Sequence, residues 1–311
     1  MNLQTLKSVL RKIPGMSFLA YLRYFYFISP VTALKRKLKV NKYTKAPEFD
    51  EIKKLKNTKL GEACVVVGNG PSVKMSDLDL IQQSGIDSFG ANRILDILDK
   101  TEWRPTYLSV MDPTFITNEH TRTHTPEEYS KQIEESGVKF AFLIHLLKDV
   151  LVPSEKHIYT YVNFAKTYSL DLMPFSDDAS VYVSDLGNVI SYSIQIAYYL
   201  GYRKIYVYGI DGTYPKYLDI DGKFKVREIS NAHVEGIRTN SYDTQKSVAA
   251  KSRYFAVKEG GYADSRKDNK GYNMCREFAE KNGMEIINLT HGGAIENFER
   301  QNFYDVLKIK N

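Results

Sequence analysis

The chain has 311 residues, of which 43% are hydrophobic and 26% charged, a composition typical of a globular protein. This length suffices for one large or two modest domains whose core needs no disulfide staples. The two cysteines, Cys64 and Cys275, exclude a disulfide scaffold and a cysteine-rich zinc module, so both thiols are expected to be buried and unpaired. We expect no secretory signal peptide, because the N-terminus lacks a compact apolar run that ends in a small-residue cleavage site.

The net charge of +6 is concentrated at the N-terminus. Residues 1–45 contain no acidic side chain, and the rest of the chain has 33 basic and 37 acidic residues, a formal charge of −4. A nucleic-acid-binding protein needs a basic face on its folded body, so this asymmetry argues against a nucleic-acid partner. The basic residues of the segment are Lys7, Arg11, Lys12, Arg23, Lys35, Arg36, Lys37, Lys39, Lys42 and Lys45.

Residues 13–34 form an aromatic and apolar stretch between these basic groups. Arg23 divides it into uncharged runs of ten and eleven residues, whereas a spanning helix needs about twenty, and Pro14 and Pro30 interrupt it further. Aromatic rings flanked by Lys and Arg favour an interfacial anchor on an anionic membrane surface. The alternatives are a spanning helix, or a helix packed on the protein's own body or in the interface of a homo-oligomer. Residues 1–59 are therefore predicted to be a membrane-associating or packing segment.

From residue 60 onward, short apolar runs alternate with helical patterns. This alternation predicts an α/β domain over residues 60–311, with a Rossmann-like, mostly parallel sheet and helices on both faces. A polar, weakly periodic segment, residues 212–270, is expected to be a lid. A helix is expected from about Ser76, which would cap it, and two others at 189–200 and 272–281. The expected strands are 63–67, 86–90, 106–110, 139–144, 158–162, 204–208 and 285–289.

The expected ligand site lies at the carboxyl ends of the strands, where open α/β sheets bind their ligands. Glycines there let the backbone approach a ligand, and asparagine side chains offer both donors and acceptors. The first loop has neither the GK[ST] ending of a P-loop nor the third glycine of a dinucleotide fingerprint. The pattern indicates a phosphate or nucleotide ligand, and the alternative is a tight turn without one. The residues placed there are Gly68, Asn69, Gly70, Pro71, Ser72, Asn92, Asp112, Gly209 and Asp211.

Several motifs resemble two related families. GNGPSV (68–73), Asn92 and LGYRKIYVYGID (200–211) are similar to motifs of the bacterial lipooligosaccharide sialyltransferases. Gly187 and Asn188 before the helix at 189–200, and INLTHGGAI (287–295), resemble the motility-accessory-factor family, described as 6-hydroxymethylpterin-diphosphokinase-like. Together the matches span residues 63–295.

The resemblance implies a glycosyltransferase of bacterial surface polysaccharide synthesis, such as lipopolysaccharide or capsule. It would transfer an acidic sugar, sialic acid-like or Kdo-like, from a CMP-activated donor to a hydroxyl of a glycan or glycolipid acceptor. Asn69 and Asn92 would hold the nucleotide, with Gly187 and Asn188 nearby. His233 would act as general base, while Tyr214 and Tyr217 stabilise the departing phosphate. With the basic segment, this predicts a cytoplasmic enzyme, peripheral on the inner face of the cell membrane.

One residue of the family pattern is missing, since residues 183–186 lack the arginine expected before the helix. Arg238 and Arg253 are the candidates to bind the sugar carboxylate instead. His291 is a further substrate-binding candidate and the second candidate for the base. His145 is interpreted as structural and His157 as exposed.

No essential metal or cofactor is expected, because the CMP-sugar is itself a substrate. Two pairs of aspartates, at 77 and 79 and at 219 and 221, mimic a metal-binding DxD motif but are interpreted as a helix start and a turn. His120 and His124 have metal-ligand spacing without an evident third ligand.

Two other functions stay open. A pterin pyrophosphokinase with ATP and Mg²⁺ would need clustered carboxylates and a basic clamp, whereas the strand ends carry asparagines and single aspartates. A non-catalytic sugar-nucleotide-binding subunit is the other alternative.

Overall fold

The structure is a computed structural model of the 311-residue chain. It describes residues 45–119, 122–163, 174–212, 216–218, 224–226, 234–238, 270–293 and 295–307. The chain divides into two compact units, Met1–Pro47 and Glu48–Asn311. Most of the N-terminal segment and of the expected lid thus lie outside the described residues. Within the described ranges, no helix has the length and apolar character needed to cross a membrane.

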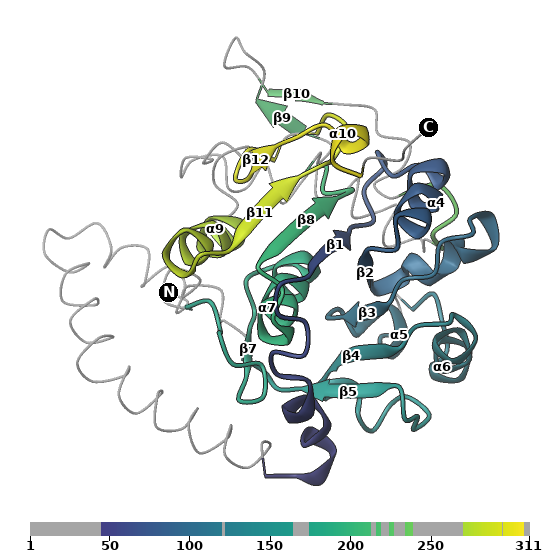
Figure 1. The fold of residues 1–311 in the computed structure, drawn as a ribbon. Coiled ribbons are helices and arrows are strands. Elements are labelled where there is room, and N and C mark those ends of the chain that lie inside the picture. Colours follow the sequence, from purple (N-terminus) through teal and green to yellow (C-terminus); the bar gives the residue numbers. More distant parts are fainter. Residues whose placement is uncertain are drawn as a thin grey trace, which may run out of the picture. The chain divides into compact units, whose positions relative to one another are not determined.

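Eight of the described strands form a single sheet in which the paired neighbours run parallel (Figure 1). They are β1 (Ala63–Val67), β2 (Asp87–Ala91), β3 (Tyr107–Val110), β4 (Phe140–Ile144), β5 (His157–Thr160), β8 (Lys204–Tyr208), β11 (Glu285–Asn288) and β12 (Glu299–Arg300). Their order is β12-β11-β8-β1-β2-β3-β4-β5. The predicted α/β class with a parallel Rossmann-like sheet is confirmed.

Two short strand pairs lie outside this sheet. The first, parallel, joins β6 (Val162–Asn163) to β7 (Val183–Ser184). The second, antiparallel, joins β9 (Lys216–Leu218) to β10 (Phe224–Val226).

Helices cover both faces of the large sheet (Figure 1). α7 and α9 contact each other on one face, and α4 contacts α10 on the other. Right-handed crossovers place helices on opposite faces when the chain proceeds along the sheet in opposite directions, from β1 toward β5 and from β8 toward β12. The α-helices are α4 (Met75–Ser84), α5 (Thr114–Thr117), α6 (Pro126–Glu135), α7 (Val189–Leu200), α9 (Lys270–Asn282) and α10 (Phe303–Leu307). The 3₁₀ helices are η2 (Pro47–Phe49), η3 (Glu51–Leu55), η4 (Asn92–Lys100) and η5 (His145–Leu147).

The strand order reverses between β1 and β8. From β1 the chain proceeds outward through β2, β3, β4 and β5, and then returns to the other side of β1 to form β8 and β11. β1 and β8 pair from Ala63↔Lys204 to Val67↔Tyr208, so both end at the same level. Their carboxyl ends therefore flank the topological switch point, where doubly wound sheets bind ligands.

α7 shows how local sequence fixes an element. Asn188 precedes it, and its side-chain oxygen accepts a hydrogen bond from the Ser191 N–H at 2.8 Å, which satisfies one free donor of the first turn. Gly201 ends it with φ +115°, a conformation that favours glycine. The predicted helix at 189–200 is confirmed at both ends.

Two local predictions are wrong. α4 begins at Met75 after Lys74 and has no side-chain cap, so Ser76 lies inside the helix. Asp79, three residues further on, accepts hydrogen bonds from the Thr101 hydroxyl and the Glu102 N–H, at 2.5 and 2.7 Å. His157 was expected to be exposed, but it begins β5 and only 6% of it is exposed. η3 packs against this edge strand, and burial lowers the pKa of His157.

Two further expectations are confirmed. Both cysteines are free and buried. His145 is structural, since its Nδ1 accepts a hydrogen bond from the Val162 N–H at 3.2 Å.

The segment from Glu48 to residue 59 belongs to the second unit. The N–H groups of Asn57 and Lys59 donate to the carbonyls of Tyr199 and Leu200, at 3.0 and 2.7 Å. This segment thus lines the amino edge of the sheet, at the C-terminal end of α7.

Candidate functional site

Two predicted loops interlock at the switch point. The N–H groups of Gly68 and Gly70 donate to the carbonyls of Tyr208 and Gly209, at 2.7 and 2.9 Å. A Cβ on Gly70 would overlap the Asp211 carboxylate and lie 2.6 Å from the Gly209 carbonyl oxygen. Glycine is therefore required at residue 70 for the two loops to meet, which is a packing role that the sequence did not reveal.

Asp211 joins the loops through its carboxylate. Its Oδ2 accepts hydrogen bonds from the Ser72 hydroxyl at 2.8 Å and the Ser72 N–H at 3.3 Å. Burial raises the pKa of Asp211, and the hydrogen bonds from Ser72 oppose the rise. The neighbouring Ile210 N–H donates to the Thr290 hydroxyl at 3.1 Å, which attaches the INLTHGGAI loop as well. Three motifs far apart in the sequence thus meet at one place.

Asn69 lies between the ends of β1 and β2. Its Nδ2 donates to the carbonyl of Ala91, the last residue of β2, at 3.0 Å. Within the described part of the chain, its Oδ1 is buried and accepts no hydrogen bond. Buried polar atoms are almost always paired in proteins, so this oxygen is suited to accept a hydrogen bond from a bound ligand.

Asn92 performs the same bridging between β2 and β3. Its φ is +47°, in the left-handed region that asparagine tolerates better than most residues. Its Oδ1 accepts from the N–H groups of Met111 and Asp112, at 3.0 and 3.4 Å. Asp112 in turn accepts from the N–H and hydroxyl of Thr114, at 2.9 and 2.6 Å, at the start of α5. The polar residues predicted to share this edge therefore do so.

The N-terminus of α7 faces the same edge, because a helix that leads back to a parallel strand runs against the strand direction. Gly187 has φ +88°, and Asn188 caps the helix. Both predicted residues thus lie at the carboxyl side of the sheet, where α7 begins.

His291 lies in a cluster that the sequence did not reveal. Its Nε2 is 2.7 Å from Oδ2 of Asp77, which is only 1% exposed. The same carboxylate accepts from the hydroxyls of Tyr208 and Tyr304, at 2.6 and 3.1 Å. This cluster thus connects the β11 loop to α4 and α10. Asp77 and His291 are 214 positions apart, so only the fold brings them together.

Some of the remaining candidate residues form ion pairs, and the others lie outside the described residues. The Arg238 guanidinium lies 3.5 Å from the Asp96 carboxylate, and His124 lies 2.7 Å from the same group. Among the described residues, no group of three or more His, Cys, Asp or Glu side chains is arranged to hold a metal. Outside the described residues lie His120, Tyr214, His233, Arg253 and the side chain of Tyr217.

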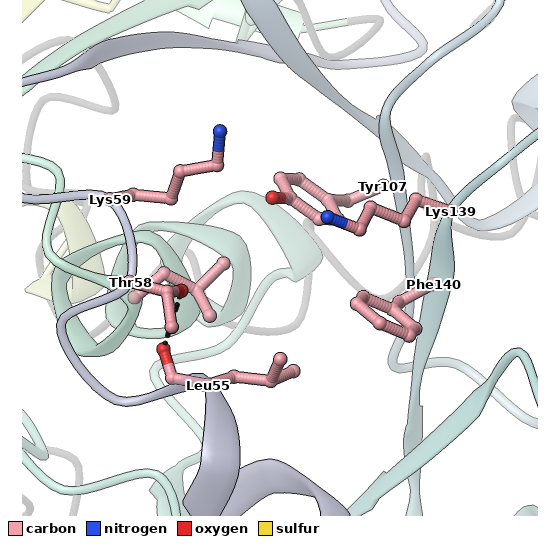
Figure 2. A pocket seen from close by; sticks show the side chains of 7 residues that line it. Leu55, Thr58, Lys59, Tyr107, Lys139 and Phe140 are labelled. Atoms are coloured by element: carbon pink, nitrogen blue, oxygen red, sulfur yellow. Dashed lines mark hydrogen bonds between the residues drawn. The ribbon is translucent and has the colours of Figure 1, made fainter.

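A cavity of about 280 Å³ lies at the opposite, amino edge of the sheet (Figure 2). Lys59 and Lys139 point into it from opposite sides, with the Tyr107 hydroxyl between them (Figure 2). The Lys59 ammonium pairs with Asp87 and Glu62, at 2.7 and 2.9 Å. None of the predicted site residues lines this cavity, so we place the candidate site at the switch point.

A doubly wound parallel sheet whose glycine-containing loops interlock at the switch point defines a Rossmann-like ligand-binding domain. The chain belongs to the MptE-like family, described as 6-hydroxymethylpterin diphosphokinase MptE-like, whose sequence model matches residues 37–217. This confirms the predicted resemblance to the 6-hydroxymethylpterin-diphosphokinase-like family.

One similar solved structure is the MAf glycosyltransferase from Magnetospirillum magneticum AMB-1. It is 16% identical, with a TM-score of 0.44, and the match covers 82% of this chain. The chain spans 35% of that protein, about a third of its length. No curated protein matches the sequence.

Proposed function

We propose that the protein is a glycosyltransferase of bacterial surface polysaccharide synthesis that transfers an acidic sugar from a CMP-activated donor. The observation that carries the proposal is the buried Oδ1 of Asn69 at the switch point, which has no hydrogen-bond partner among the residues that the structure describes. A nucleotide offers donors for such an oxygen, from the exocyclic amine of cytosine or a ribose hydroxyl. The nucleotide would lie against the loops that follow β1 and β8, which are joined by the hydrogen bond from the Gly70 N–H to the Gly209 carbonyl.

The proposed reaction needs one base and one donor to the leaving group. The imidazole of His233 takes the proton of the acceptor hydroxyl as its oxygen attacks the anomeric carbon. The bond from that carbon to the CMP phosphate oxygen breaks, and CMP leaves with the electron pair. The hydroxyls of Tyr214 and Tyr217 donate hydrogen bonds to the phosphate, so the proposal assigns no metal ion to this step.

One described contact supports the role of His233. Val234, the next residue in the chain, donates its N–H to the carbonyl of Asn69 at 2.9 Å. The peptide that follows the proposed base is therefore attached to the proposed nucleotide loop. Arg238, Arg253 and His291 remain the candidates to contact the sugar or the acceptor.

The family description favours a second candidate, a pterin pyrophosphokinase that uses ATP and Mg²⁺. That reaction needs carboxylates available to Mg²⁺ and a basic clamp for the triphosphate. Both Asp77 and Asp79 are engaged by protein donors, from Tyr208 and Tyr304 in one case and Thr101 and Glu102 in the other. The third candidate is a sugar-nucleotide-binding subunit without catalytic activity.

Nucleotide titration separates the first two candidates. We expect CMP to raise the melting temperature more than ATP with Mg²⁺, GDP or UDP. At equal concentration, a ligand that binds only the folded state stabilises it more the tighter it binds. Differential scanning fluorimetry at matched nucleotide concentrations measures the shift. Equal stabilisation by ATP with Mg²⁺ would overturn the assignment of the donor. Release of CMP from a CMP-sugar then distinguishes an enzyme from a binding subunit.

We also propose that residues 1–45 attach the protein to an anionic membrane surface on the cytoplasmic side. Each basic residue near such a surface contributes roughly 1 kcal/mol of attraction. Deletion of residues 1–45 should leave a folded protein that no longer sediments with phosphatidylglycerol liposomes, whereas the full chain does. Aggregation of the truncated protein would show instead that the segment packs on the body or on a second copy.

A further inference from the structure

Residues 234–238 are hydrogen-bonded at both ends. At the first residue, the Val234 N–H donates to the Asn69 carbonyl at 2.9 Å. At the last, the Arg238 N–H donates to Oδ2 of Asp96 at 3.0 Å, and the Arg238 carbonyl accepts from the Arg93 guanidinium at 2.7 Å. Asp96 and Arg93 both belong to η4. The segment therefore connects η4 to the loop that contains Asn69.

The two η4 side chains are buried charged groups. Arg93 is 8% exposed, and the side chain of Asp96 is 2% exposed. Burial alone would raise the pKa of Asp96, but hydrogen bonds from His124 and the Arg238 N–H hold it below its usual range. Burying charged groups is costly unless each is hydrogen-bonded. Oδ1 of Asp96 is paired with His124 and Gln132, and the segment supplies the donor to its Oδ2 and the acceptor for Arg93, which indicates a specific attachment.

The close fit of the segment agrees with this. Val234 and Ile237 are buried. Gly236 has φ +107°, and a Cβ there would lie 3.2 Å from the Ile97 side chain and 2.5 Å from the Lys100 ammonium. Glycine at residue 236 therefore allows the segment to lie directly against η4.

We propose that Arg93 and Asp96 are positioning residues that clamp residues 234–238 against the nucleotide loop and so set the place of His233. The inference rests on the proposed function, in which His233 is the general base. Both hydrogen bonds of the clamp use the backbone of Arg238. Among the described residues, its side chain forms one ion pair, the 3.5 Å contact with Asp96. Removing the Arg238 side chain should therefore preserve the clamp, whereas removing that of Arg93 should open it.

Hydrogen exchange tests the clamp without any substrate. In the full-length protein, we expect Arg93→Ala to make the peptide that covers residues 234–238 exchange at least about tenfold faster, because its hydrogen bonds then open locally. The exchange rates of peptides from β1 and α7 should stay at their wild-type values. Arg238→Ala is the matched control and should exchange like the wild type in this peptide. Asp96→Asn is the second opening variant, should Arg93→Ala fail to fold.

Kinetics test the positioning role. A displacement of about 1 Å of a catalytic group lowers turnover up to roughly 100-fold, so we expect Arg93→Ala to lose about 10- to 100-fold in kcat. The dissociation constant for CMP should change less than about threefold, because this variant keeps its contacts with the nucleotide. Arg93→Lys, which can still donate to the Arg238 carbonyl, should recover part of the loss.

Each of the two measurements tests a different part of the proposal. Unchanged exchange in both opening variants would overturn the clamp, and faster exchange with wild-type kcat would overturn its positioning role. If the wild type itself releases no CMP from any CMP-sugar, the proposed function fails, and with it the role for His233. Arg238→Ala is compared with the wild type by hydrogen exchange alone, because the Arg238 side chain is itself a candidate to bind the sugar.

Discussion

Asn69→Ala should weaken CMP binding roughly 10- to 100-fold while the domain stays folded. Loss of a hydrogen bond that leaves a buried partner unsatisfied costs about 1–3 kcal/mol, and each 1.4 kcal/mol corresponds to a factor of ten in affinity. The side chain donates one hydrogen bond to Ala91, and its buried oxygen has no partner in the described ranges. Its removal should therefore lower the melting temperature by only a few degrees. Isothermal titration with CMP and thermal unfolding measure the two effects.

Asn282→Ala is the matched control for this variant. Its Nδ2 also donates a single hydrogen bond to a backbone carbonyl, that of Phe278 at 2.8 Å, but from the end of α9. Both variants lose the same kind of contact, so an effect on CMP that is specific to Asn69 reports the nucleotide site. Wild-type affinity in Asn69→Ala would place the nucleotide elsewhere.

Local patterns were sufficient to predict the framework of the domain. The apolar run of β1 with its glycine loop, and α7 between Asn188 and Gly201, are determined by neighbours within a few residues. The carboxyl-edge rule then placed Asn69, Asn92 and Asp112 together, because parallel strands end at the same edge. These predictions needed only the element type and the direction of the chain.

The contacts between distant side chains could not be predicted in the same way. Asp77 looked like a helix-start carboxylate or half of a DxD motif, and its use by His291 depends on how the β11 loop meets α4. Similarly, the spacing of His120 and His124 gave no sign that Nε2 of His124 contacts Asp96 on η4. The only signal for the clamp was an Arg and an Asp three positions apart in an otherwise apolar stretch, residues 93–98.

His233→Ala should lower kcat about 10²–10⁴-fold near neutral pH, the usual loss for a general base, while CMP affinity changes little. Three observations support this expectation. Residues 230–233 (SNAH) resemble a stretch of the sialyltransferase lid, imidazole accepts a proton near pH 7, and the following residue, Val234, is hydrogen-bonded to Asn69. Turnover of a CMP-sugar by the purified variant, with CMP titration as the control for folding, measures both quantities.

His291→Ala is the comparison that decides between the two histidines. Nε2 of His291 contacts Asp77, whose carboxylate keeps its donors from Tyr208 and Tyr304 when the imidazole is removed. We therefore expect this variant to lose about 1 kcal/mol of stability, the net contribution of one hydrogen bond, and to retain most of its turnover below the melting temperature. Normal turnover in His233→Ala with a large loss in His291→Ala would transfer the role to His291. Full activity in both variants would exclude both imidazoles as the base. The base would then be sought among the strand-end carboxylates. These are Asp112 and Asp211, each of which has one carboxylate oxygen that accepts two hydrogen bonds, from Thr114 and Ser72 respectively.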